Sequence, residues 1–256
     1  MSATSLTWLQ VAASGLLVAV AVIVAGWQRL EVTRDLLIAT VRAAAQLAVV
    51  GAVLLLLFQY AGASGALGWV TVMVLIAGQV AGRRGRGVPR APLLATTAVA
   101  LGSLVSLATL LLFQILPIRP EAIVPIGGMI VATAMQATGL VLLRLAEDVH
   151  KARPAIEARL SLAMPADQAF APHRRSAART ALLPAIDSTK VVGLISLPGA
   201  MTGLILAGVD PMTAIRYQIV VMYMLLAAGT VSAATASHLA QHTLFDTPAH
   251  RLRSRG

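Results

Sequence analysis

The chain has 256 residues, of which 58% are hydrophobic and 12% are charged, with a net charge of +10 and no cysteine. A soluble domain of this size needs more polar surface, so this composition indicates a membrane protein that crosses the bilayer several times. It excludes disulfides and thiolate metal sites, and the basic residues lack the interleaved aromatic residues that are typical of nucleic-acid-binding proteins.

Apolar runs follow one another along almost the whole chain, and they predict an all-α polytopic membrane protein with seven transmembrane helices. In chain order the expected spans are 6–26, 36–60, 66–81, 91–116, 122–145, 181–207 and 212–239. We expect them to form a single transmembrane domain over 1–256, because the only sizeable segment between them, 147–179, is too short for an independent core.

The basic residues predict the orientation of these spans. Most of the 20 Lys and Arg residues fall in 27–35, 82–90, 144–179 and the tail, which lie on one side of a seven-span arrangement. Since basic loops favour the cytoplasm, we expect the N-terminus outside and the C-terminus in the cytoplasm.

The segment 147–179 carries three spaced prolines. Pro154 and Pro165 are each suited to open a helix, through "AIEARLSL" and "ADQAF", and Pro172 is expected to end the second one. The segment therefore predicts two short cytoplasmic helices between spans five and six. A loop lying in the membrane interface is the alternative.

Local motifs for catalysis are absent from the sequence: it has no phosphate-binding loop, no nucleophile elbow and no zinc-protease helix. His238 and His242 are spaced i, i+4 and share a helix face, so they are weak candidates for metal ligands. Two polar residues that mark the water interface are the simpler interpretation.

Polar residues and methionines recur inside the expected spans, where the polar residues bond helix to helix and the methionines fill irregular gaps or contact a transition metal. They are Gln46, Gln79, Thr133, Gln136, Thr138, Ser196, Thr202 and Gln218, with Met129, Met135, Met201, Met222 and Met224.

The sixth expected span contains its strongest helix breakers, Pro198 and Gly199, near the middle. Broken helices occur at membrane depth where the freed backbone groups face protein or a water-filled path. Gly199 and Gly203 also form a G-x-x-x-G face that favours close helix crossing. A proline kink that only shapes packing is the alternative.

Four stretches together resemble the iron-export permease family of FetB, which also includes plant aluminium-sensitivity transport proteins. They are "VRAAAQLAVVGAVL", "IVPIGGMIVATAMQATGL", "EARLSLAMPADQA" and "ALLPAIDSTKVVGLISLPGAMTGLILAGVDPMTAIRYQI", which keep their order over nearly the whole chain.

The resemblance implies the permease subunit of an ABC transporter that exports iron, and so a non-enzymatic chain. Such a subunit works as a homodimer with a separate ATP-binding subunit, so this chain would bind no cofactor and ATP and Mg would sit on the partner. "EARLSLA" is similar to the EAA loop of bacterial importers, which implies that coupling to the ATPase involves Glu157, Leu160, Ser161 and Leu162.

Further roles follow from the same resemblance. The expected transport pathway comprises Thr133, Met135, Gln136, Ser196, Pro198, Gly199, Met201 and Thr202, and the expected dimer packing uses Gly199 and Gly203. The chain departs from the family at Ala163, where relatives commonly carry Gly, and at Ala132 and Thr133, where they commonly carry Gly-Asn.

Two other functions stay open on the sequence alone. No Asp or Glu lies deep in any expected span, which favours an organic or lipid-like substrate, because hard cations prefer oxygen ligands. A membrane scaffold that regulates a partner and transports nothing is the third hypothesis.

Overall fold

The computed structural model describes residues 7–60, 62–246 and 251–252, and its contacts divide the chain into two compact units, Met1–Tyr60 and Ala61–Gly256. In the first unit, α1 (Trp8–Trp27) packs against α2 (Thr33–Tyr60). A capping box opens α1: the Thr7 hydroxyl accepts from the Gln10 amide, and the Gln10 side chain accepts from the Thr7 amide over 2.9 Å.

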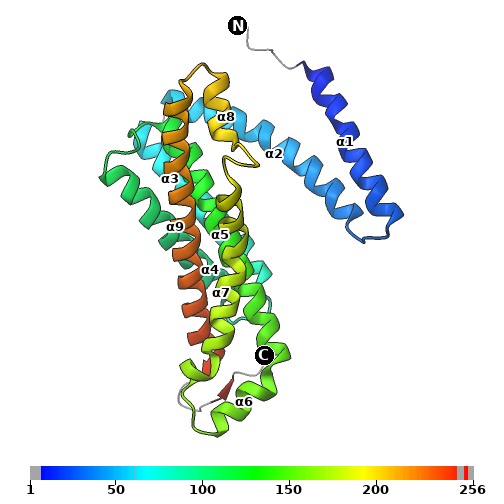
Figure 1. The fold of residues 1–256 in the computed structure, drawn as a ribbon, viewed down its shortest axis with the longest axis vertical. Coiled ribbons are helices and arrows are strands. Elements are labelled where there is room, and N and C mark those ends of the chain that lie inside the picture. The colour runs from blue at the N-terminus through cyan, green and yellow to red at the C-terminus, as the bar shows by residue number, and fades with distance from the viewer. Residues whose placement is uncertain (1–6, 61, 247–250, 253–256) are drawn as a thin grey trace. The chain divides into compact units, whose positions relative to one another are not determined.

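The second unit is a helical bundle (Figure 1). Its helices are α3 (Gly62–Arg84), α4 (Ala91–Leu112), α5 (Pro120–Lys151), α6 (Arg153–Ser161), α7 (Ala166–Val191), α8 (Gly199–Leu206) and α9 (Pro211–Leu244). Two short strands, β1 (Phe245–Asp246) and β2 (Arg251–Leu252), pair antiparallel after α9. The helix α5 lies at the centre, since it packs on α3, α4, α7 and α9.

Small residues let the helices of this bundle approach closely. A Cβ on Gly102 of α4 would meet the Ser232 hydroxyl and the Ala228 carbonyl of α9, and one on Gly127 of α5 would meet Val70 of α3. Close packing of this kind replaces the hydrophobic effect as the force between helices inside a bilayer. The bundle therefore holds α9 firmly against α4 and α5.

Within the described residues, six helices are long and apolar enough to cross a membrane: α1, α2, α3, α4, α5 and α9. They cover six of the seven expected spans. The expected third span, 66–81, was drawn too short, because α3 begins at Gly62 and continues through Arg84. Hydropathy locates only the apolar part of a span, whereas the helix α3 continues beyond that part through polar residues of the membrane interface.

The expected sixth span, 181–207, is not one continuous helix. It consists of the end of α7, an irregular segment at 192–198, and the short helix α8 (Figure 1). Pro198 accordingly precedes α8 as its N-cap, with φ −64° and ψ 147°, and does not kink a helix interior. A proline disfavours helical geometry in the residue before it, which explains why the chain stays irregular up to Pro198.

The prediction that Pro172 ends a second short helix was wrong. The helix α7 continues through Pro172 and Pro184 to Val191, so of the two short helices expected in 147–179 only α6 is short. A proline inside a helix costs about 3 kcal/mol. Packing on α5 and α9 offsets this cost, because α7 buries Ala169, Phe170, Ala177 and Ala181.

The loops with most arginines in the second unit gather at one end, which we call the basic end. One hydrophobic cluster joins Val88 of the α3–α4 loop, Ile156 of α6, Phe170 of α7 and Phe245 after α9. The spacing of basic residues along the sequence thus corresponds to one end of this bundle. Its orientation in a membrane stays a prediction.

Candidate functional site

The irregular segment at 192–198 is closed by its own backbone. Gly193 has φ +81°, a conformation that glycine adopts without strain, and its amide donates to the Ser196 carbonyl over 2.9 Å. The amides of Leu194 and Ile195 both donate to the Val191 carbonyl, over 3.2 and 3.0 Å. The interruption is therefore a defined turn, in which the freed donors find partners.

A cavity of about 560 Å³ lies between this turn, α8 and α9. Its walls are Thr189, Val192, Gly193, Leu197, Pro198, Met201, Ile215, Gln218, Ile219, Met222 and Tyr223. A volume of this size falls in the range of small-molecule sites, about 300–1,000 Å³. The broken helix thus borders a space that would hold a ligand far larger than a bare ion.

A smaller cavity of about 170 Å³ adjoins the first between α5, α7 and α9. It is lined by Thr133, Gln136, Pro184, Ala185, Ser188, Thr189, Met222, Leu225 and Leu226. Thr189 and Met222 line both spaces, so the two cavities adjoin at these two side chains. Together the cavities follow α9 from the turn toward Thr133 and Gln136.

The walls of the two cavities are mostly apolar, and their few polar side chains are uncharged. The Thr189 hydroxyl donates to the Ala185 carbonyl over 2.7 Å, and none of the residues that line the two cavities is acidic or basic. Gln218 is 6% exposed, and its Oε1 accepts no hydrogen bond from the described residues. Buried polar atoms are usually paired, so an unpaired one beside a cavity marks a place for a ligand or water.

The structure brings four of the predicted pathway residues to these cavities. Thr133 and Gln136 line the smaller one, and Pro198 and Met201 line the larger one. The others lie elsewhere: Met135 packs against the core cluster, Ser196 and Gly199 are exposed, and Thr202 is half-buried with its hydroxyl donating to the Pro198 and Gly199 carbonyls.

Sequence reasoning missed the residues that α7 and the start of α9 contribute. Ser188, Thr189 and Gln218 lie in the longest stretch that carries the family resemblance, but no pathway role was predicted for them, and Met222 and Tyr223 lie beyond that stretch. A glutamine in an otherwise apolar stretch of α9 was the one signal that pointed to this wall.

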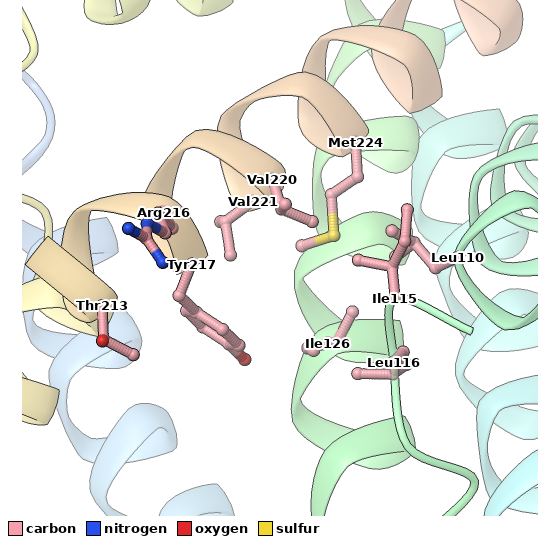
Figure 2. Close-up of a pocket in the computed structure, with 10 residues that line it drawn as sticks. All are labelled: Leu110, Ile115, Leu116, Ile126, Thr213, Arg216, Tyr217, Val220, Val221 and Met224. Carbon is pink, nitrogen blue, oxygen red and sulfur yellow. The ribbon is translucent and has the colours of Figure 1, made fainter. Parts of the chain in front are cut away.

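A third cavity in the second unit, of about 260 Å³, is shown in Figure 2. Figure 2 shows Arg216 and Tyr217 on α9, with Ile115 and Leu116 from the chain after α4. The Asp210 carboxylate accepts from the Thr213 amide over 3.0 Å and caps the start of α9 here. This pocket shares no lining residue with the other two.

At the basic end, the predicted coupling helix is α6. Glu157 accepts from Arg153 over 2.7 Å, the Ser161 hydroxyl donates to the Glu157 carbonyl over 3.0 Å, and Leu162 is 81% exposed. Leu160 is instead 7% exposed and belongs to the core cluster, so its predicted contact with a partner is corrected here. Leu162 is the exposed apolar residue of this segment.

The remaining predicted sites are exposed. Gly199 and Gly203 are open to the outside, and a Cβ at either position would meet nothing within 4 Å, so close packing against a second copy stays a prediction. The His238 and His242 Nε2 atoms lie 3.1 Å apart on α9. Among the described residues, no group of three or more His, Cys, Asp and Glu side chains is placed to hold a metal ion.

The six long apolar helices of the described chain define a multi-pass membrane protein, and its second unit has a broken helix beside two cavities. The family described as Uncharacterised protein family (UPF0014) matches residues 8–245, and the chain belongs to this family. This confirms the resemblance seen in the sequence motifs.

Curated relatives come from plants and bacteria. The chain is 42% identical over 228 residues to UPF0014 membrane protein STAR2 of Oryza sativa subsp. japonica, covering 89% of this chain and 80% of that protein. It is 36% identical over 247 residues both to Protein ALUMINUM SENSITIVE 3 of Arabidopsis thaliana and to the Probable iron export permease protein FetB of Escherichia coli (strain K12). These matches cover 95% and 96% of this chain, and 89% and 95% of the relatives. No solved structure matches the chain.

Proposed function

We propose that this chain is the permease subunit of an ABC transporter in a bacterial inner membrane, and that it works as a homodimer. The observation that carries this proposal is the interrupted helix at 192–198 beside two cavities that share Thr189 and Met222. Transporters place broken helices around their substrate sites, near the middle of the membrane. The chain itself would be no enzyme and would bind no cofactor, with ATP and Mg held by a separate ATPase subunit.

Iron is the first candidate substrate and export the first candidate direction, because the Escherichia coli relative is named a probable iron export permease. The two methionines at the larger cavity, Met201 and Met222, offer thioether sulfur, a ligand for soft metal ions. The residues that line both cavities include no carboxylate, which makes the cavities less suited to a hard cation.

A second candidate is a neutral organic or lipid-like molecule. It is favoured by the volume of about 560 Å³ and by walls that combine apolar side chains with Gln218, Thr189 and Tyr223. The same coupling machinery would serve either substrate, so the two candidates differ only in what occupies the cavities.

Coupling to the ATPase would use the exposed face of α6. Leu162 offers an apolar anchor beside Glu157 and Ser161, and interfaces of this kind draw their affinity from a few buried anchors. Leu160 would act from within, since it fixes α6 to the core at the basic end.

The test is ATP hydrolysis by the permease reconstituted in lipid with its ATPase partner. We expect hydrolysis to rise with one member of a panel that contains Fe²⁺, other divalent metals, small neutral organic molecules and lipids. Stimulation by Fe²⁺ favours the first candidate and stimulation by an organic molecule the second. An ATPase that binds the permease and responds to nothing in the panel, with no transport into vesicles, would support the scaffold hypothesis.

A further inference from the structure

Two imidazole rings meet on the exposed side of α9 near its end. His238 and His242 are both exposed, their ring centroids lie 4.6 Å apart, and their Nε2 atoms lie 3.1 Å apart. Since two neutral imidazoles present both donors and acceptors, one ring nitrogen donates to the other in the absence of any third group. The i, i+4 spacing places both imidazoles on the same face of the helix, so that their Nε2 atoms lie next to each other.

This spacing matches two adjacent positions around one metal ion. Histidine nitrogen binds zinc at about 2.0–2.1 Å. Two such bonds with their nitrogens 3.1 Å apart enclose an angle of about 100° at the metal, between the values of square-planar and tetrahedral coordination. No large rearrangement of the side chains would be needed to admit an ion.

The pair also lies where water reaches it. At about 1.5 Å per residue, the 34 residues of α9 extend about 50 Å, against a hydrocarbon core of about 30 Å. His238 and His242 follow Pro211 by at least seven turns, about 40 Å along the axis. The neighbouring, buried side of this stretch carries Gln241, which is bonded to Arg174 and Asp167 of α7 at the basic end. The imidazoles thus stand beyond the apolar core.

We propose that His238 and His242 form a binding site for a divalent first-row transition-metal ion of the class that imidazole prefers, with water filling the remaining positions. By the order of stability of such complexes, Cu²⁺ should bind more tightly than Zn²⁺. The site shares no residue with the two cavities, so it does not rest on the proposed function and stands whatever the transported substrate is.

The test is calorimetric titration of the full chain with Zn²⁺, purified in detergent through a tag that contains no histidine. We expect one zinc ion per chain. Loss of an outer-shell partner already costs about 10–100-fold in metal affinity, so His238→Asn and His242→Asn should each weaken binding by at least about tenfold. His242→Cys should retain zinc binding, because a thiolate replaces the lost imidazole.

Two control variants separate this pair from the other histidines of the described chain. His150→Asn removes an exposed imidazole, and His173→Asn removes one that faces the Asp148 carboxylate over 3.6 Å. Both should bind zinc as the parent chain does. As a measurement free of mutation, the Cu²⁺ electron paramagnetic resonance spectrum of the parent chain should show two coordinated nitrogens. Equal zinc affinity in all variants, or a spectrum with one nitrogen or none, would reduce the pair to a hydrogen bond and overturn the proposal.

Discussion

Arg174 on α7 donates a hydrogen bond to Gln241 on α9 over 3.0 Å, although 67 residues separate them in the chain. The amide nitrogen of the same Gln241 donates to the Asp167 carboxylate over 3.1 Å, so a single buried side chain joins a cation and an anion of α7 to α9. The joint lies at the basic end beside α6, and both helices line the cavities further along. In the proposed coupling to an ATPase, this joint would pass a movement of α6 and α7 to the walls of the proposed pathway.

The first prediction concerns this joint. Gln241→Leu leaves Arg174 and Asp167 without their shared partner, so we expect a loss of about 1–3 kcal/mol in stability. It should retain ATPase binding, because the α6 surface is unchanged, yet lose most substrate-stimulated hydrolysis. Thermal unfolding, pull-down and ATPase assays measure the three effects. Gln114→Leu, at an exposed position after α4, is the matched control. Full substrate-stimulated ATP hydrolysis by Gln241→Leu would show that this contact plays no part in coupling.

A second prediction separates the two leucines of the coupling segment. Leu162→Asp should change stability by less than about 0.5 kcal/mol, because the side chain is exposed. It should nevertheless weaken ATPase binding by about 1 kcal/mol or more. Leu160→Asp should instead destabilise the chain by at least about 2–5 kcal/mol, because it buries a carboxylate in the core cluster. Quantitative pull-down beside thermal unfolding distinguishes them, and unchanged ATPase binding by Leu162→Asp would remove this contact from the mechanism.

A third prediction tests the place where the two cavities adjoin. Met222→Phe adds a rigid ring where the two spaces meet, so transport should fall strongly at a cost in stability below about 1.5 kcal/mol. Val220→Phe is the matched control, since Val220 is also half-buried on α9 but lines the separate third cavity. Transport into vesicles is the measurement. Equal transport by both variants would place the substrate route elsewhere.

The fourth prediction concerns the end of α6. Ala163 has φ +58°, and the amides of Ala163 and Met164 donate to the carbonyls of Leu160 and Arg159 in a Schellman motif. An alanine in the left-handed conformation costs about 1–2 kcal/mol. Glycine removes this strain, but part of the gain is offset because glycine makes the unfolded chain more flexible. Ala163→Gly should therefore stabilise the protein by about 0.5–1 kcal/mol. Ala158→Gly, inside the same helix, should destabilise it by about 1 kcal/mol. A lower unfolding temperature for Ala163→Gly would contradict the assigned geometry.

A fifth prediction addresses orientation. The chain has no cysteine, so single cysteines report on sidedness directly. Cysteines at Arg86 and Gln168, exposed at the basic end, should resist an impermeant thiol reagent in intact cells. Cysteines at Gln114 and Ala207, exposed in the loops at the other end, should react. The reverse pattern would invert the proposed topology.

Most helix positions could be predicted from the sequence, because hydropathy and the residues that start and end helices act locally. Asp210 and Pro211 start α9, and Pro154 lies within the first turn of α6 as expected. It failed at Pro172, where packing of Phe170 and Ala177 outweighs the local preference of proline. It also assigned Leu160 to the surface, because a two-turn helix has no periodicity that separates its inner from its outer side.

Composition and the order of apolar runs determined by themselves that this is a multi-pass helical membrane protein, since a bilayer demands long apolar stretches with internally paired backbones. The motif strings placed it in its family. Only the tertiary structure decided that Thr189 of α7 and Gln218 of α9 meet Pro198 around one cavity, that Thr133 and Gln136 of the distant α5 line the adjoining one, and that Leu160 faces inward. Such juxtapositions depend on how helices cross and rotate, which is set by contacts between side chains distant in the chain and leaves no local signal.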